Sequence, residues 1–131
     1  MKVLVDTSIW SYAFRSNKPE FAHHVESLVK LISTNQVLII GAIKQEILSG
    51  YSDLNKFNTL QNKISPFENT PVLDEDYIQA ALFSNMCRSQ GIQGSPIDFL
   101  ICAVAHRLKV EIFTTDKDFN HYQKHIPIKL L

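Results

Sequence analysis

Residues 95–118 read SPIDFLICAVAHRLKVEIFTTDKD, and this stretch joins a helical pattern directly to a strand pattern. From Pro96 to Lys109 the sequence is apolar on nearly every side of a helix, which is typical of a helix buried in a protein interior. The short apolar run from Glu111 to Thr114 favours a β-strand. The stretch therefore predicts a buried helix followed by a strand of the same core.

The same alternation of strands and helices extends toward both ends of the chain. Lys2 to Val5 is a short apolar run, and Val37 to Ile40 is a continuous apolar run that suits a buried parallel strand. Strands that alternate with helices predict an α/β fold in one domain over residues 1–131, with a parallel sheet covered by helices on both faces. The other expected elements are helices at Glu20 to Thr34, Ala42 to Ser49, Leu54 to Ile64, Asp74 to Gln90 and Asp116 to Lys124, a weak extended segment at Pro71 to Leu73 and a last strand at Ile128 to Leu131.

Composition excludes several classes of protein. The chain has 131 residues, 45% of them apolar, with 13 Lys and Arg against 13 Asp and Glu. A run of about 18 apolar residues, which a membrane helix needs, is absent from the sequence. Cys87 and Cys102 lie in apolar helical runs without metal-type spacing, so we expect two buried free thiols and a cytoplasmic protein. The zero charge balance by itself argues against a nucleic-acid-binding protein.

Acidic residues follow two of the predicted strands. Asp6 comes directly after Lys2 to Val5, and Asp116 and Asp118 follow the strand that ends at Thr114. The carboxyl ends of parallel strands are where open α/β sheets bind ligands. Each acid has a simpler interpretation as well, because Asp is a favoured helix cap and turn residue.

Two further acids belong to predicted helices. Glu46 lies one turn into the helix after the second strand, on its apolar arc, where a carboxylate requires a partner or a metal. A salt bridge to Lys44 is the alternative interpretation. Asp98 is the third residue of a helix that Ser95 and Pro96 begin, so it could serve only to cap that helix. The helix is apolar nearly all round, however, which places Asp98 near the interior.

Together, these acids predict a cluster of carboxylates at one edge of the sheet. Like charges repel, so such a cluster persists mainly where a divalent cation neutralises it. A site made only of oxygen ligands favours Mg²⁺ or Mn²⁺ over zinc. The five histidines are spread along the chain and form no competing zinc motif.

Four segments in this order carry a family resemblance that covers the whole chain. They are Val3-Leu4-Val5-Asp6-Thr7-Ser8, Glu46 with its helix, Pro96-Ile97-Asp98-Phe99-Leu100-Ile101-Cys102-Ala103-Val104-Ala105, and Thr114-Thr115-Asp116-Lys117-Asp118-Phe119. Together they resemble the PIN-domain ribonucleases, in particular the VapC-type toxins of bacterial type II toxin–antitoxin systems. The resemblance implies a PIN-like three-layer sandwich.

The resemblance also implies roles for individual residues. Asp6, Glu46, Asp98 and Asp116 would be the catalytic acids and the ligands of Mg²⁺ or Mn²⁺. The supporting residues would be Thr7, Ser8, Thr114 and Asp118. Separately from the resemblance, Arg15, Lys18, Lys44 and Lys117 are candidates for holding phosphates, because they lie close to these acids in the sequence. The segment from Tyr51 to Asn69 carries no family motif, and its role is left open.

The implied activity is metal-dependent hydrolysis of RNA by a homodimeric toxin that a cognate antitoxin inhibits, with no membrane association. If the acids bind metal, the rest of the surface keeps a basic surplus, so zero net charge is compatible with an RNA substrate. Two alternatives remain: a phosphatase of the haloacid-dehalogenase type and a non-enzymatic, receiver-like α/β binding module. The former would need a second Asp where Ser8 stands, and the latter would need paired acids after the first strand.

Overall fold

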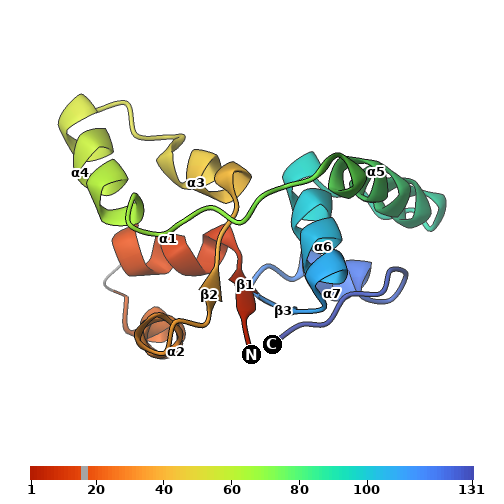
Figure 1. The fold of residues 1–131 in the computed structure, drawn as a ribbon, viewed down its shortest axis with the longest axis horizontal. Coiled ribbons are helices and arrows are strands. Elements are labelled where there is room, and N and C mark those ends of the chain that lie inside the picture. Colours follow the sequence, from red (N-terminus) through yellow and green to blue (C-terminus); the bar gives the residue numbers. More distant parts are fainter. Residues whose placement is uncertain (16–17) are drawn as a thin grey trace.

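Three parallel strands form the central sheet of the computed structural model, which describes residues 1–15 and 18–131. Strand β1 (Val3–Val5) lies between β2 (Val37–Leu38) and β3 (Glu111–Phe113). Val3 is in register with Val37 on one side and with Glu111 on the other. All three strands point the same way, so their carboxyl ends meet at one edge (Figure 1). The predicted α/β fold with a parallel sheet is confirmed.

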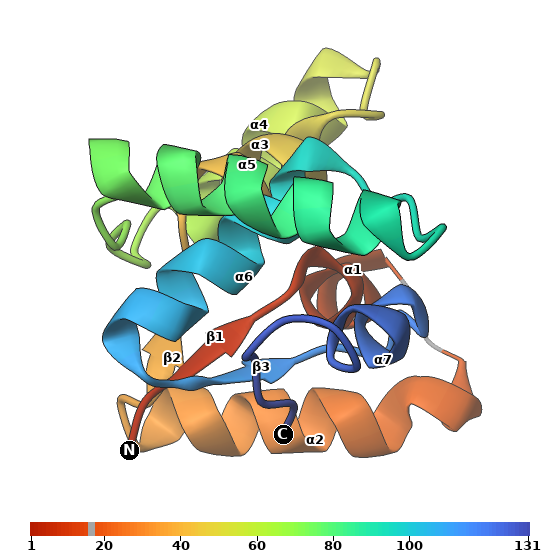
Figure 2. The same ribbon diagram turned by 90° about the vertical axis from the view of Figure 1, so that its right-hand side faces the viewer.

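Helices cover the sheet on both sides, as the alternating pattern predicts. Figure 2 shows α2 (Ala22–Ser33) running along one side of the strands and α6 (Pro96–Leu108) lying across the other. Helix α5 (Asp74–Ser89) packs on the outside of α6. Because α6 lies between the sheet and α5, its residues Phe99 to Ala105 are all buried. The nearly all-round apolar pattern of this helix is thereby explained.

One helix that the sequence analysis missed begins immediately after the first strand. Helix α1 (Thr7–Arg15) starts next to Asp6 and buries Ile9 and Trp10. The indole nitrogen of Trp10 donates to the carbonyl of Val5, 3.1 Å away, which ties the helix back to the strand. Apolar residues at positions 9, 10, 13 and 14 give the helical spacing that could have revealed it.

The other helices differ from expectation mainly at their ends. A short 3-10 turn, η1 (Pro19–Phe21), precedes α2, and Val29 of α2 is 57% exposed. The remaining helices are α3 (Gly41–Leu48), α4 (Leu54–Ile64) and α7 (Asp118–Tyr122). None of the helices in residues 1–15 and 18–131 is long and apolar enough to cross a membrane.

Two predicted extended segments do not form strands. The C-terminal segment Ile128 to Leu131 makes only a single parallel bridge, between Leu130 and Ile112. Pro71 to Leu73 is irregular, and the bridge in this region joins Asn69 to Ile39 instead. The backbone of Leu73 is extended, so the weak extended segment is present there without ladder pairing.

The segment without a family motif contributes to the core. Asp53 caps the start of α4, and its carboxylate accepts from the backbone amide of Asn55 at 2.9 Å. Leu60 and Ile64 of this helix are buried. Beyond it, Phe67 packs edge-on against Trp10 with 5.0 Å between ring centroids.

Cys87 and Cys102 are buried free thiols, as expected.

A buried ion pair joins the start of α5 to the end of α6. Asp76 is 1% exposed and accepts from Arg107 Nε at 2.8 Å and from its Nη2 at 3.0 Å. The backbone amide of Leu73 also donates to this carboxylate, at 2.9 Å. These contacts lower the pKa of Asp76, although burial alone would raise it. Asp76 is therefore ionised, and its charge depends on Arg107.

We expect Arg107→Gln to lower the free energy of unfolding by about 2 kcal/mol, because it leaves Asp76 as an unpaired buried charge. The value lies below that of a fully enclosed pair because the Arg107 side chain is 26% exposed. Urea denaturation at neutral pH measures the change. Arg88→Gln, on the exposed end of α5, is the matched control and should shift stability by less than about 0.5 kcal/mol. Equal effects of the two substitutions would contradict this account.

Candidate active site

Asp6 occupies the end of the central strand, where the sheet presents its carboxyl edge. Its backbone amide donates to the carbonyl of Phe113 at 2.9 Å, which continues the ladder between β1 and β3. Its side chain is 5% exposed and accepts from Thr114 Oγ1 at 2.7 Å and from Ser8 Oγ at 3.3 Å. The predicted supporting hydroxyls of Ser8 and Thr114 therefore both contact Asp6.

The segment from Thr114 to Asp118 brings two more acids to this edge. The amide of Asp116 donates to Thr114 Oγ1 at 3.0 Å, so one threonine hydroxyl bridges Asp6 and the Asp116 backbone. The amide of Asp118 donates to Asp116 Oδ1 at 2.9 Å, where α7 begins. The carboxylate of Asp116 thus accepts one backbone amide next to α7 and lies in the acidic cluster as well.

Asp98 reaches the same edge from the first turn of α6. Ser95 caps this helix by accepting from the amide of Asp98 at 3.1 Å, as predicted. Because the cap uses the backbone amide, it does not account for the carboxylate. That carboxylate instead accepts from the hydroxyl of Tyr122 on α7, 2.7 Å from Asp98 Oδ2. The sequence analysis gave Tyr122 no role, since its helix pattern carries no sign of this contact.

Glu46 projects from α3 on the other side of Asp6. Its Oε1 accepts from the hydroxyl of Thr7 at the start of α1. The alternative interpretation, a salt bridge to Lys44, is wrong, because the ammonium of Lys44 donates to the carbonyl of Phe67. Glu46 is half-buried, and its charge contributes to raising the pKa of Asp6.

A group of three carboxylates at this edge could hold a metal ion. Oxygens of Asp98, Asp116 and Asp118 all lie within 4.8 Å of one another. Asp118, expected only as an additional acid, is thus a full member of the group, whereas the predicted ligands Asp6 and Glu46 are not among its three members. The charge of Asp6 acts on Asp98, and the charge of Glu46 acts on Asp6. The donor set consists of carboxylate oxygens alone, which fits hard cations such as Mg²⁺ or Mn²⁺. The acidic cluster is consistent with a metal site.

Two acids of the site, Asp6 and Asp98, have pKa values above the ordinary value of an aspartate. Burial raises the pKa of Asp98 to about 6, and the charges of Asp6 and Asp116 add to this rise, while the Tyr122 hydrogen bond opposes it. Burial also raises the pKa of Asp6, against the hydrogen bonds from Thr114 and Ser8. A divalent cation would reverse both effects, because it favours the ionised carboxylates.

Arg15 and Lys44, which we expected at the rim, donate to backbone carbonyls. The guanidinium of Arg15 donates to the carbonyls of Ile47 and Ser49 and lies 4.5 Å from the centre of the Tyr51 ring. It therefore joins α1 to the end of α3. Lys44 is bonded to Phe67, as described above. Lys18 and Lys117 are exposed.

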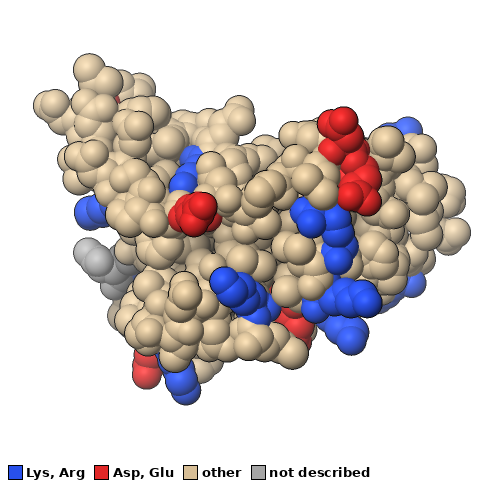
Figure 3. All heavy atoms as spheres, viewed as in Figure 1, with Lys and Arg blue, Asp and Glu red and all other residues tan. Residues whose placement is uncertain are grey.

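Charged side chains are distributed unevenly over the surface, despite their zero sum. On the face drawn in Figure 3, basic side chains gather over the C-terminal end of α6. Acidic side chains gather over the start of α5, whose first turn contains Asp74, Glu75 and Asp76. The overall balance is therefore a poor guide to the local charge of any one site.

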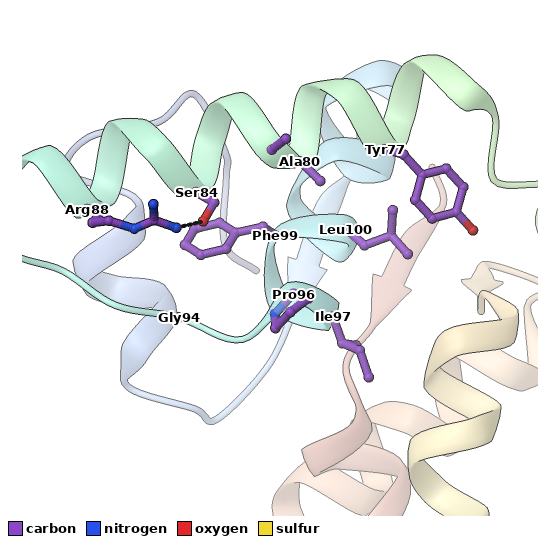
Figure 4. Close-up of a pocket in the computed structure, with 10 residues that line it drawn as sticks. Tyr77, Ala80, Ser84, Arg88, Gly94, Pro96, Ile97, Phe99 and Leu100 are labelled. Carbon is purple, nitrogen blue, oxygen red and sulfur yellow. Dashed lines mark hydrogen bonds between the residues drawn. The ribbon is translucent and has the colours of Figure 1, made fainter.

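An apolar pocket of about 410 Å³ lies beside the acidic site, between α5 and the start of α6. Figure 4 shows Tyr77 and Ala80 of α5 facing Ile97 and Leu100 of α6 across it. Ser84 closes one end, with Arg88 donating to its hydroxyl at 3.5 Å. Its lining contains no carboxylate, so the pocket is distinct from the acidic cluster.

Comparison with known protein families decides the assignment. A model of the PIN domain matches residues 3–125. The chain belongs to the PIN domain family. PIN domains are typically metal-dependent nucleases, and this PIN domain has the acidic cluster such chemistry needs. Neither the haloacid-dehalogenase alternative nor the receiver-like alternative is supported by this match.

Solved structures share this PIN fold at low sequence identity. The whole chain matches 98% of a chain of VapBC2 from Rickettsia felis bound to a DNA fragment from their promoter, with a TM-score of 0.79 and 16% identity. For FitAcB from Neisseria gonorrhoeae the TM-score is 0.78 at 19% identity, over 98% of this chain and 96% of that one. A toxin–antitoxin complex from Klebsiella pneumoniae gives 0.66 at 18% identity, over 90% of each chain. No curated protein matches the sequence.

Proposed function

We propose that this PIN domain is a metal-dependent endoribonuclease that acts as the toxin of a type II toxin–antitoxin module. The observation that carries the proposal is the meeting of Asp98, Asp116 and Asp118 at the carboxyl edge of the sheet, with Asp6 and Glu46 beside them. Three acids from two separate segments lie together there, which is more than helix capping requires. The structural similarity to chains of VapBC and FitAcB supports the toxin role.

In this proposal the acids divide the work between metal binding and orientation of water. Asp6 and Asp98 would be the primary ligands of Mg²⁺ or Mn²⁺, and Glu46 and Asp116 would bind a second ion or orient the attacking water. The chemistry that a bound ion would supply is acidification of a water and neutralisation of charge on the leaving oxygen of the phosphodiester. Thr114 and Ser8 hold Asp6 in position, and Thr7 holds Glu46.

Induced expression in bacteria tests the reaction class. We expect growth to stop within a short induction, and sequencing of RNA 5′ ends to reveal new ends at a restricted set of positions. Ends in transfer RNA, ribosomal RNA or messenger RNA would each support endoribonuclease activity and would name the substrate. An unchanged distribution of ends, with the folded protein present, would refute it.

The proposed protein partners are a cognate antitoxin and a second copy of this chain. Helix α5 offers a surface for the second copy, because four of its large apolar side chains are exposed. They are Tyr77, Ile78, Leu82 and Met86, which are 57%, 72%, 52% and 38% exposed. Ile78, Leu82 and Met86 are spaced four residues apart and so lie along one stripe of the helix.

We expect the purified protein to have twice the mass of one chain by light scattering, and Ile78→Lys with Leu82→Lys to give the mass of one chain. Two lysine charges in an apolar interface remove its hydrophobic contribution. Val29→Lys, which replaces an exposed apolar residue of α2, is the matched control and should leave the mass of the dimer unchanged. A monomeric wild type, or a double variant that remains dimeric, would refute the assignment of this surface.

A further inference from the structure

Tyr122 is buried at the junction between α7 and the acidic site. Its side chain is 0% exposed, and its ring packs against Phe99 and Phe119, with centroids 4.9 and 5.2 Å away. Its hydroxyl donates to Asp98 Oδ2 at 2.7 Å. A phenylalanine would make the same ring contacts. The hydroxyl is therefore not explained by packing, and its partner is a carboxylate of the acidic group.

Gly94 leaves room for this tyrosine. A Cβ atom at Gly94 would lie 2.3 Å from the Tyr122 hydroxyl oxygen and 2.7 Å from Cζ of the ring, and it would also lie 2.8 Å from Cε2 of Phe99. The φ angle of Gly94 is not positive, unlike those of Gly50 and Gly91, so backbone conformation does not require glycine here. Space does. Figure 4 shows Gly94 in the segment that leads into α6 beside Phe99.

The hydrogen bond fixes how the Asp98 carboxylate is turned. Asp98 stands on the first turn of α6 and Tyr122 on α7, so the bond joins two elements that both border the acidic group. A carboxylate can rotate about its Cβ–Cγ bond, and one strong donor on Oδ2 selects the rotation. Mutation of a residue that orients a metal ligand in this way lowers metal affinity or activity by about 10–100-fold.

We propose that Tyr122 is a positioning residue, whose hydroxyl holds the Asp98 carboxylate in the orientation that a divalent cation requires, and that Gly94 keeps Tyr122 in place. This inference rests on the proposed function, since it assumes that the acidic group binds a cation. It adds two residues to the site, neither of which touches the cation itself.

Binding of Mn²⁺, followed by electron paramagnetic resonance and by calorimetry, tests the proposal without an activity assay. We expect Tyr122→Phe to remain folded, with an unchanged amide NMR spectrum away from the site, and to bind Mn²⁺ about tenfold more weakly. The spectrum of the bound ion should change as well. Tyr51→Phe, which removes a hydroxyl from the ring that lies beside Arg15, is the matched control and should bind Mn²⁺ like the wild type.

Gly94→Ala is a second variant, which disturbs Tyr122 through a substitution outside α7. The added methyl group displaces the tyrosine, so we expect the same weakening of Mn²⁺ binding even if Tyr122→Phe fails to fold. Wild-type affinity in a folded Tyr122→Phe or Gly94→Ala variant would overturn the positioning role while leaving the proposed function intact. Failure of the wild type itself to bind Mn²⁺ would overturn both proposals.

Discussion

Asp98→Asn is expected to abolish growth arrest on induction while the protein stays folded. The amide keeps the shape of the side chain but removes the charge that a divalent cation needs. We expect RNA cleavage to fall by about 100-fold or more, because mutation of a residue that only contacts a metal ligand already lowers activity by about 10–100-fold. Growth curves and RNA-end sequencing after induction measure the effect.

Folding of this variant should not suffer, for two reasons. Ser95 caps α6 through the backbone amide of residue 98, which the substitution leaves unchanged. Burial also disfavours the charged carboxylate, so a neutral amide is at least as stable in this place at neutral pH. Asp53→Asn is the matched control, since asparagine caps a helix as well as aspartate does. Growth arrest by a folded Asp98→Asn variant would remove Asp98 from the catalytic machinery.

Metal affinity is expected to fall steeply as the pH decreases from 7 to 5. A pKa of about 6 means that Asp98 is mostly ionised at pH 7 and mostly protonated at pH 5 in the metal-free protein. Protons then compete with the cation, which weakens binding about tenfold through Asp98 alone. The raised pKa of Asp6 increases the loss further. Calorimetry with Mn²⁺ at both pH values measures it, and equal affinity would contradict the assignment of both acids as ligands.

The stability of the metal-free protein should show the opposite dependence on pH. Between the ordinary Asp pKa of 3.8 and about 6, the folded chain holds a proton on Asp98 that the unfolded chain has released. The free energy of unfolding therefore decreases as the pH rises through this window. We expect a higher melting temperature at pH 5 than at pH 7 without metal, and a smaller difference in Asp98→Asn. Millimolar Mg²⁺ should raise the melting temperature at pH 7.

The sequence was sufficient to predict the elements whose apolar pattern follows directly from their burial. Helix α6 is apolar all round because α5 covers its outer side, and β1 is apolar because both of its neighbours and both faces bury it. Helix α1 was missed, although Asp6 is a possible helix cap, because the apolar pattern that follows Asp6 is short. The prediction of a last strand at Ile128 to Leu131 was wrong, because an apolar run alone does not specify how many β-bridges the segment forms.

The acids of the site were found from their positions after strands and at the start of a helix, because topology brings those positions together. The sequence carries no such signal for the residues that contact these acids. Tyr122 lies in the expected helix, but its contact with Asp98 depends on how α7 packs against α6. Likewise, Arg15 and Lys44 were chosen by closeness in sequence, and the structure directs both toward backbone carbonyls.

Cleavage of RNA by the purified protein is the most direct test of the central claim. Wild-type protein freed of metal with a chelator is incubated with total bacterial RNA, with and without added Mg²⁺ or Mn²⁺, beside Asp6→Asn and Asp98→Asn purified in the same way. The account predicts cleavage by the wild type only when metal is added, and none by either variant. Cleavage that persists in chelator, or that the folded variants match, would contradict it.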